Sequence, residues 1–244
     1  MTAGTTARRP LVISHRTNAG TALPNSLEGI AAALADGVDG VEMDVRSTRD
    51  GIPVLWHDAT IERAPGVVVP LSGLTLEALR AGPVQRAGHV CAIVTLEAAL
   101  AAVGGRTRAV LDIKERGLAE AVTRLVHASG AQSRCWVWAF DPVAGAEYER
   151  ELPQAQRALL VGTDWDRQFD RRPYLDVARE YRCAAVSLEA SLVTPDAVAE
   201  AQADGLHVYT WTVNDAAELA RVQAAGVDGV CTDYPARARE AFRT

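Results

Sequence analysis

Eight short apolar runs, separated by amphipathic stretches, constrain the fold of this 244-residue chain more than any other feature. This alternation is typical of parallel β-sheets in which each strand is followed by a crossover helix. The runs lie at residues 11–14, 38–44, 109–113, 135–140, 158–161, 184–188, 207–212 and 229–232. Eight such units predict an α/β fold, a (β/α)₈ TIM barrel, and we expect one domain over residues 1–244.

Signals for helix ends lie between the runs, as a barrel requires. The predicted helix starts are Asn25 with Glu28 three residues later, Thr95, Thr194 before Pro195, and Asn214. Glycines follow three of the predicted helices, where a left-handed residue commonly ends a helix; these are Gly37, Gly205 and Gly226.

One short pattern occurs twice. Gly37-Val-Asp-Gly-Val-Glu-Met-Asp44 resembles Gly226-Val-Asp-Gly-Val-Cys-Thr-Asp233. Each copy predicts a helix end, a tight turn, a strand and then a carboxylate at the carboxyl end of that strand. The repeated use of one unit by a barrel accounts for the similarity.

The segment between the second and third runs, about residues 45–94, is too long for an ordinary barrel loop. The Asp50-Gly51 pair predicts a turn, after which residues 52–56 return as a short strand that ends at His57. Beyond Asp58 we expect irregular structure with one helix near residues 75–80. The segment is therefore predicted to be a small hairpin and loop insertion over the top face, where barrels keep their active sites.

The charge and composition exclude several classes of function. The net charge is −6 and no run of lysine and arginine occurs, so we expect no nucleic-acid partner. No apolar stretch is long enough to span a membrane, residues 1–10 contain no secretory core, and the four cysteines form no C-x-x-C pair. We expect a cytoplasmic protein with a small-molecule substrate, and the sequence leaves its oligomeric state open.

Three carboxylates follow two neighbouring strands of the predicted barrel. Glu42 and Asp44 alternate with Met43, so both should point into the barrel, and Asp112 ends the next strand. Carboxylates directed at one point repel each other unless a cation lies between them, and Mg²⁺ or Ca²⁺ prefers such oxygen ligands. Lys114 lies on the same face as Asp112 and could bind a phosphate oxygen.

Two histidines accompany these carboxylates. His15, followed by Arg16, ends the first run, and His57 ends the inserted hairpin. A single strand-end carboxylate is more often a salt-bridge or helix-cap partner than a ligand, and a single histidine is as often packed as catalytic. Five titratable groups at adjacent strand ends, however, are hard to explain by stability alone. The remaining histidines, His89, His127 and His207, have no such neighbours.

The order of the motifs resembles the glycerophosphodiester phosphodiesterase family from about Leu11 to Pro235. His57 follows Asp44 by 13 positions, as that family places its second histidine, so the block from Glu42 to Asp58 is the most specific part. The motifs are His15-Arg16, Asn25-Ser26-Leu27, Gly40-Val-Glu42-Met-Asp44-Val, Thr48-x-Asp50-Gly51, Val54-Leu-Trp-His57-Asp58, Arg63, Asp112-Ile-Lys114, Trp211-Thr-Val-Asn214 and Thr232-Asp233-Tyr-Pro235.

The resemblance implies a metal-dependent phosphodiesterase that hydrolyses glycerophosphodiesters to an alcohol and glycerol phosphate. It implies roles for eight residues: His15 and His57 as the general acid/base pair; Glu42, Asp44 and Asp112 as ligands of one divalent cation; Arg16 and Lys114 as phosphate contacts; and Trp211 on the alcohol side of the pocket. The cation would be Mg²⁺ or Ca²⁺, with Mn²⁺ as a further candidate.

Three parts of the sequence depart from the family pattern and leave alternatives open. Thr17 stands where the family has glycine, and Leu23-Pro24-Asn25-Ser26 replaces Pro-Glu-Asn-Thr. Asp112 stands where glutamate is commoner in the family, and the related sphingomyelinase D toxins also have an aspartate there. One alternative is therefore a phospholipase D-type enzyme that acts on lysophospholipids, with transient lipid contact, and releases a cyclic phosphate. The other is a non-catalytic barrel that binds a phosphate or a lipid.

Overall fold

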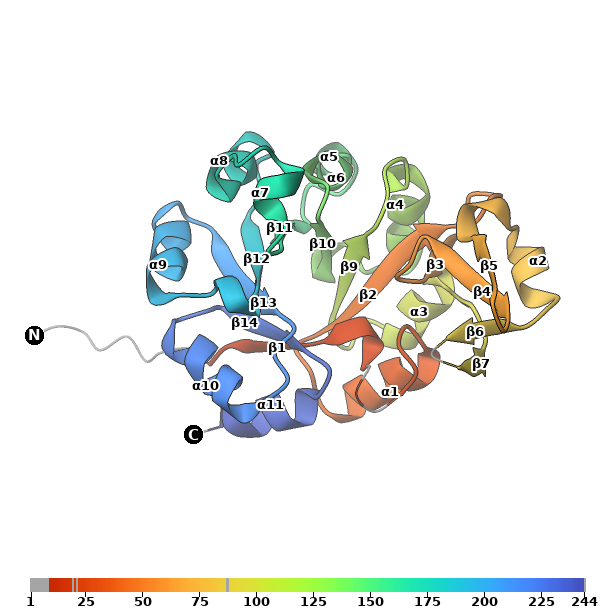
Figure 1. Ribbon diagram of the computed structural model, residues 1–244, viewed down its shortest axis with the longest axis horizontal. Helices are drawn as coiled ribbons and strands as arrows, with labels where there is room; N and C mark the ends of the chain where they lie inside the picture. The colour runs from red at the N-terminus through yellow and green to blue at the C-terminus, as the bar shows by residue number, and fades with distance from the viewer. Residues whose placement is uncertain (1–8, 19, 21, 87, 244) are drawn as a thin grey trace, which may run out of the picture.

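Eight parallel strands close into a barrel, as the sequence predicts (Figure 1). The computed structural model describes residues 9–18, 20, 22–86 and 88–243, so most of the segment 1–10, in which no secretory core is expected, lies outside the described residues. The barrel strands are β1 (Leu11–Ser14), β2 (Gly40–Ser47), β9 (Arg108–Ile113), β10 (Cys135–Ala139), β11 (Gln156–Val161), β12 (Ala185–Glu189), β13 (His207–Trp211) and β14 (Gly229–Thr232). The barrel closes at β1, where Ile13 lies opposite Gly40 on one side and Cys231 on the other.

Helices surround the barrel on its outer face (Figure 1). They are α1 (Leu27–Ala35), α3 (Leu96–Val103), α4 (Ala119–Ala128), α5 (Pro142–Ala146), α6 (Tyr148–Glu151), α7 (Trp165–Gln168), α8 (Tyr174–Glu180), α9 (Pro195–Ala203), α10 (Ala216–Ala224) and α11 (Pro235–Ala241). Among the described helices, none combines the length and apolar character that crossing a bilayer requires.

Alternation along the strands divides the apolar side chains into layers. In β9, Val110 belongs to the cluster inside the barrel, whereas Ala109 and Leu111 belong to a cluster between the strands and the helices. Trp138 and Tyr209 fill much of the interior, with ring centroids 5.5 Å apart. The filled interior confines any site to the end of the barrel, and the carboxyl ends of the strands carry the polar residues.

The helix starts confirm two of the predicted caps and correct two others. Thr95 and Thr194 accept hydrogen bonds from the backbone N–H groups of Ala98 and Ala197. The predictions for Asn25 and Asn214 are wrong, because the next residues, Ser26 and Asp215, cap α1 and α10. The two asparagines make other contacts, described below. The glycines at 37, 205 and 226 have positive φ angles, as predicted.

The insertion is more regular than the sequence predicts. The expected hairpin forms, with β3 (Pro53–Leu55) antiparallel to β2, and β8 (Val94–Thr95) pairs with β3. The prediction of irregular structure beyond Asp58 is wrong, because this segment forms a separate antiparallel sheet. The strand order in that sheet is β5 (Val67–Pro70), β4 (Thr60–Ala64), β6 (Val84–Arg86) and β7 (His89–Cys91). The predicted helix is α2 (Leu76–Arg80).

A small core of its own holds the insertion together beside the barrel (Figure 1). Trp56, Ile61, Leu71, Leu79 and Val84 are all nearly inaccessible to solvent. Burial of such side chains stabilises by roughly 1.5–3 kcal/mol each, which a small sheet needs because isolated hairpins are marginal in water.

A tight turn after β1 fixes the approach of α1 to the barrel. Arg16 and Thr17 have φ angles of 46° and 74°, values that favour glycine, which the family pattern has at position 17. The Thr17 hydroxyl is buried and accepts a hydrogen bond of 3.1 Å from the Ser26 backbone N–H. A Cβ atom on Gly29 would lie 2.4 Å from that hydroxyl oxygen, so Thr17 requires glycine at position 29.

We therefore predict that Gly29→Ala lowers the free energy of unfolding by about 1–3 kcal/mol, because the added methyl group overpacks the contact with Thr17. Urea unfolding of the wild type and the variant measures this cost. In a Thr17→Gly background the hydroxyl is absent, so the same substitution should cost less. Equal costs in both backgrounds would contradict the contact.

Candidate active site

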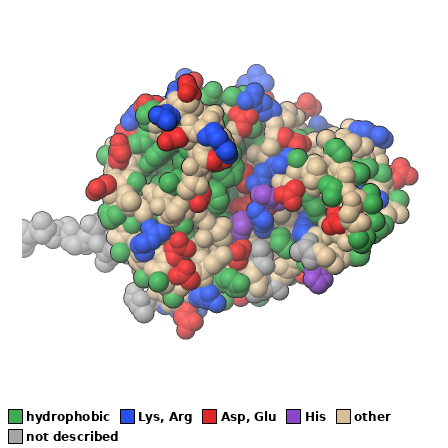
Figure 2. All heavy atoms as spheres, in the orientation of Figure 1, with side chains coloured by type: hydrophobic (Ala, Val, Ile, Leu, Met, Phe, Trp, Pro, Cys, Tyr) green, Lys and Arg blue, Asp and Glu red, His purple; other side chains and the backbone are tan. Residues whose placement is uncertain are grey.

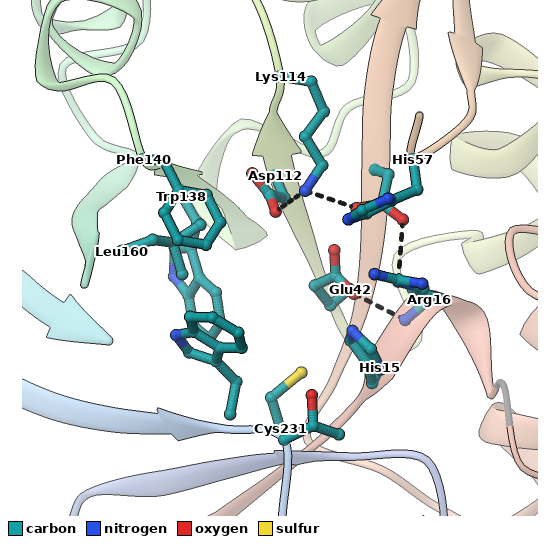
Figure 3. Close-up of a pocket in the computed structure, with 13 residues that line it drawn as sticks. His15, Arg16, Glu42, His57, Asp112, Lys114, Trp138, Phe140, Leu160 and Cys231 are labelled. Carbon is teal, nitrogen blue, oxygen red and sulfur yellow. Dashed lines mark hydrogen bonds and ion pairs between the residues drawn. The ribbon is translucent and has the colours of Figure 1, made fainter. Parts of the chain in front are cut away.

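One pocket at the carboxyl ends of the barrel strands brings together all eight side chains that the sequence singled out (Figure 3). They are His15, Arg16, Glu42, Asp44, His57, Asp112, Lys114 and Trp211. In the space-filling view, histidine and charged side chains gather in the hollow between the barrel and the insertion (Figure 2). The pocket is also lined by residues that the sequence reasoning missed, namely Trp138, Phe140, Leu160, Thr212 and Cys231.

Strand register brings the three carboxylates together. Asp44 and Asp112 are directly opposite partners in the β2–β9 pair, and Glu42 precedes Asp44 by two residues on the same face. One oxygen atom from each of the three lies within 4.8 Å of the others. All three side chains are buried, with Met43 on the opposite face against the helices.

Two cations compensate part of this negative charge. The Lys114 Nζ atom lies 2.5 Å from Asp112 Oδ2 and 2.9 Å from Asp44 Oδ1 (Figure 3). Arg16 contributes twice, because its backbone N–H donates to Glu42 Oε2 at 2.6 Å and its Nε lies 3.5 Å from Asp44 Oδ2. The turn at Arg16 therefore directs a backbone donor and a positive charge at the carboxylates.

Two carboxylate oxygens in the cluster stay without a partner among the described residues. These are Glu42 Oε1 and Asp112 Oδ1, and both are inaccessible to solvent. A buried carboxylate oxygen without a donor is costly unless a ligand compensates it. Unpaired oxygens from two carboxylates, beside a third, form a donor set that fits a hard divalent cation such as Mg²⁺ or Ca²⁺.

The pKa values follow from the same arrangement. Burial and the neighbouring Asp44 and Asp112 carboxylates raise the pKa of Glu42 well above its usual value. Burial also raises the pKa of Asp112, although Lys114 opposes the change. For Asp44 burial acts upward too, but Lys114 and Arg16 outweigh it and lower the pKa to about 2. Glu42 is thus the carboxylate whose negative charge the protein compensates least.

His15 is oriented by a carboxylate and an amide. Its Nδ1 atom lies 2.7 Å from Asp233 Oδ1, and the Asn214 Nδ2 amide donates to Asp233 Oδ2 at 2.7 Å. An ionised carboxylate only accepts hydrogen bonds, so Nδ1 carries the proton and Nε2 stays available. Burial acts to raise the pKa of Asp233, but its hydrogen bonds with His15 and Asn214 help to lower it below the usual value.

His57 is held from two directions. Its Nδ1 atom lies 2.7 Å from Asp58 Oδ1, and its backbone carbonyl accepts a hydrogen bond of 2.9 Å from Arg46 Nε. Arg46 in turn pairs with Glu115 at 3.3 Å. One histidine of the pair, His15, directly follows the barrel strand β1, whereas His57 lies at the start of the insertion.

The two asparagines that do not cap helices clamp two aspartates. Asn25 Nδ2 donates to Asp44 Oδ2 at 2.7 Å, and Asn25 Oδ1 accepts from the Asp44 backbone N–H at 3.1 Å. Asn214 makes the same two bonds to Asp233, at 2.7 and 2.9 Å. Both aspartates are the last residue of the repeated sequence pattern. The two copies of the pattern therefore share the hydrogen bonds to this last residue as well as the sequence.

An aromatic wall faces the charged side of the pocket (Figure 3). Phe140 and Trp211 pack edge to face with ring centroids 5.4 Å apart, and Trp211 Nε1–H donates to the Ser187 carbonyl at 3.0 Å. Trp138 lies below them and is almost wholly buried. The alternation of Trp138 and Phe140 at the end of β10 is the sequence signal that could have identified them.

The chain belongs to the glycerophosphoryl diester phosphodiesterase family, whose model matches residues 15–237. A glycerophosphodiester phosphodiesterase of Bacillus altitudinis is 26% identical over 93% of this chain and 96% of its own length. The Arabidopsis thaliana glycerophosphodiester phosphodiesterase GDPD4 is 28% identical over 93% of this chain and 71% of its own length. The chain is accordingly a phosphoric diester hydrolase, and its family depends on a divalent metal ion.

Solved structures share the fold. A Silicibacter pomeroyi protein assigned to the same family is 26% identical, with a TM-score of 0.87 over 96% of this chain and 93% of that one. An Oleispira antarctica phosphodiesterase, solved in complex with the product sn-glycerol-3-phosphate, is 23% identical with a TM-score of 0.78 over 97% and 98% of the two chains. At that identity the second likeness establishes the barrel fold alone.

The two neighbouring residues Asn25 and Ser26 should respond differently to substitution. Ser26→Ala removes a helix cap and should cost about 1 kcal/mol of stability while phosphodiester hydrolysis continues. Asn25→Ala removes both hydrogen bonds to Asp44, so we predict a cost of about 1–3 kcal/mol together with a loss of activity. Denaturant unfolding and an activity assay of both variants test this. Equal activity in the two variants would refute the role of Asn25.

Proposed function

We propose that this enzyme hydrolyses glycerophosphodiesters to an alcohol and glycerol phosphate, with one divalent cation and two histidines that act as general acid and general base. The observation that carries the proposal is the convergence of three buried carboxylates and two imidazoles on one pocket, with two carboxylate oxygens unpaired among the described residues. The residues that carry out the reaction would lie at the barrel end and in the first residues of the insertion.

Glu42, Asp44 and Asp112 would hold the cation, and the unpaired Glu42 Oε1 and Asp112 Oδ1 atoms support this assignment. The ion would be Mg²⁺ or Ca²⁺, since both prefer oxygen ligands. When bound, it would supply positive charge that stabilises the additional negative charge of the transition state.

Arg16 and Lys114 would bind the phosphate oxygens. The Arg16 side chain is partly exposed to the pocket, and its Nε has no hydrogen-bond partner among the described residues. Lys114 is nearly buried beside the carboxylates, which outweigh the effect of burial and raise its pKa, so it stays charged at neutral pH. Two cations fixed before the substrate arrives need no reorganisation when negative charge develops.

The two histidines would move the protons. One imidazole Nε2 would accept a proton from water, or from a hydroxyl of the substrate, as the new bond to phosphorus forms. The other would donate a proton to the leaving alkoxide as its bond to phosphorus breaks, which releases the alcohol. Attack by water gives the phosphomonoester directly, whereas attack by a substrate hydroxyl gives a cyclic phosphodiester that a water must then open to the phosphomonoester. Hydrogen bonds from Nδ1 to Asp233 and Asp58 would keep both Nε2 atoms directed at the pocket.

The resemblance puts Trp211 on the alcohol side of the pocket; we assign that side to the glycerol moiety, whose carbon atoms Trp211 and Phe140 would contact. Their wall is apolar, and the pocket residues Trp138 and Leu160 beside it are buried. Glycerol carries no charged group, so it can lie against this apolar wall without the cost of removing water from a charge.

The chemistry is tested by incubating the protein with glycerophosphoethanolamine and Mg²⁺, Ca²⁺ or Mn²⁺ and identifying the products by phosphorus NMR. We expect glycerol phosphate to form and the reaction to stop when EDTA removes the cation, because the carboxylates alone repel the anion. Activity that survives complete removal of metal would refute the metal ligands. A persistent cyclic phosphate would instead favour the phospholipase D-type alternative.

The histidine roles predict large and specific losses. His15→Ala and His57→Ala should each lower kcat by at least about 100-fold, because one proton transfer is typically worth about 10²–10⁴-fold. His127→Ala is the matched control, since His127 lies exposed on α4 away from the pocket. A near wild-type rate in either pocket variant, with His127→Ala also active, would remove that residue from the mechanism.

A further inference from the structure

We propose that Arg86, on the insertion, is a specificity-determining residue that selects glycerophosphodiesters whose leaving alcohol carries a negative charge. The inference rests on the proposed function and adds to it the class of leaving group. Arg86 lies outside every motif of the sequence analysis, and none of the eight predicted roles involves it.

The side chain of Arg86 is held in a defined place next to His57. In β6, Arg86 alternates with Gln85 and shares the inner face of the small sheet with the buried Val84. Its guanidinium carbon lies 4.0 Å from the ring centroid of Trp56, the residue directly before His57. Trp56 is itself fixed, being 4% exposed, with its Nε1–H donating to the Thr60 carbonyl at 2.9 Å.

The guanidinium has no hydrogen bond or ion pair to any residue that the structure describes, and the side chain is partly buried. Two other arginines of this region show the contrast. Arg63 donates to the carbonyls of Ala78 and Leu79, and Arg46 donates to the His57 carbonyl. No nitrogen atom of Arg86 is among the buried, unpaired polar atoms of the described residues, so its N–H donors are accessible to an incoming anion.

Charged groups of the active site are among those that act on Arg86. Burial lowers the pKa of Arg86; the neighbouring Cys91 of β7 opposes that effect most, the carboxylates of Asp44 and Asp58 oppose it too, and the positive charge of Arg16 adds to it. Asp58 is already paired with His57 Nδ1 at 2.7 Å, and Asp44 with Lys114. Neither carboxylate therefore pairs with Arg86, whose charge lies against Trp56, next in the chain to the pocket residue His57.

The two sides of the pocket suit different substituents of a phosphodiester. The aromatic wall is apolar and includes the buried Trp138, whereas the insertion side opens to solvent, with the side chains of His57 and Asp58 exposed to 41% and 70%. A charged leaving alcohol can keep part of its hydration there. The single negative charge of the phosphodiester already faces Arg16 and Lys114, so Arg86 is available for a further anion, and a guanidinium matches a carboxylate with two parallel hydrogen bonds.

Two substrates that differ in one carboxylate test the inference. Glycerophosphoserine and glycerophosphoethanolamine share the phosphodiester and the ammonium group, and the first alone has the carboxylate. We expect the wild type to prefer the serine diester in kcat/KM. Arg86→Gln should lower that preference about tenfold, and Arg86→Lys should restore part of it, since lysine keeps the charge without the planar fork.

Arg80→Gln is the matched control, because Arg80 is an exposed arginine on α2 of the same insertion. It makes the same change in net charge and should leave the preference unaltered. An equal loss for both diesters in Arg86→Gln, or an equal change of preference in Arg80→Gln, would overturn the inference. If the wild type hydrolyses neither diester, the proposed function fails instead; hydrolysis of both without a preference overturns only the role of Arg86.

Discussion

Repulsion among three buried carboxylates is the constraint on which the rest of this site depends. Glu42, Asp44 and Asp112 are kept close by strand register rather than by mutual attraction, and Lys114 bridges only two of them. Replacing well-packed apolar groups with such a cluster costs stability. The barrel bears this cost because its interior and its outer layers are filled with apolar side chains, and the remaining uncompensated charge is what a divalent cation would satisfy.

Asparagine side chains position one aspartate inside the carboxylate cluster and another outside it. Asn25 and Asn214 each bind both the side chain and the backbone N–H of one aspartate, and each stands directly before a helix cap. The first aspartate belongs to the carboxylate cluster and the second orients His15. The same pair of hydrogen bonds therefore positions Asp44 in the proposed cation site and Asp233 beside the imidazole of His15.

Regular spacing predicted the barrel and the meeting of the three carboxylates, Lys114 and the two histidines at its end, whereas the pocket roles of Arg16 and Trp211 came from the family resemblance. Period-two alternation placed Glu42 and Asp44 on one face, and the neighbouring strand placed Asp112 beside them. Spacing could not locate the caps, because Asn25 and Ser26 are both good N-cap residues. The small sheet was missed since its strands are short and partly exposed, with Val68 and Val90 58% and 70% accessible. The position of Arg86 depends on that sheet, so no local pattern indicates it.

Within the insertion, the residues proposed to act in the reaction lie apart from the residue proposed to recognise the leaving group. His57 and Asp58 follow β3, which is hydrogen-bonded to the barrel, whereas the four-stranded sheet that carries Arg86 begins only at Thr60. An exchange of residues 60–91 between relatives would thus leave the histidine pair and the carboxylates in place. Such a modular boundary allows evolution to replace the part of the surface that meets the leaving group while the machinery for breaking the bond is inherited unchanged.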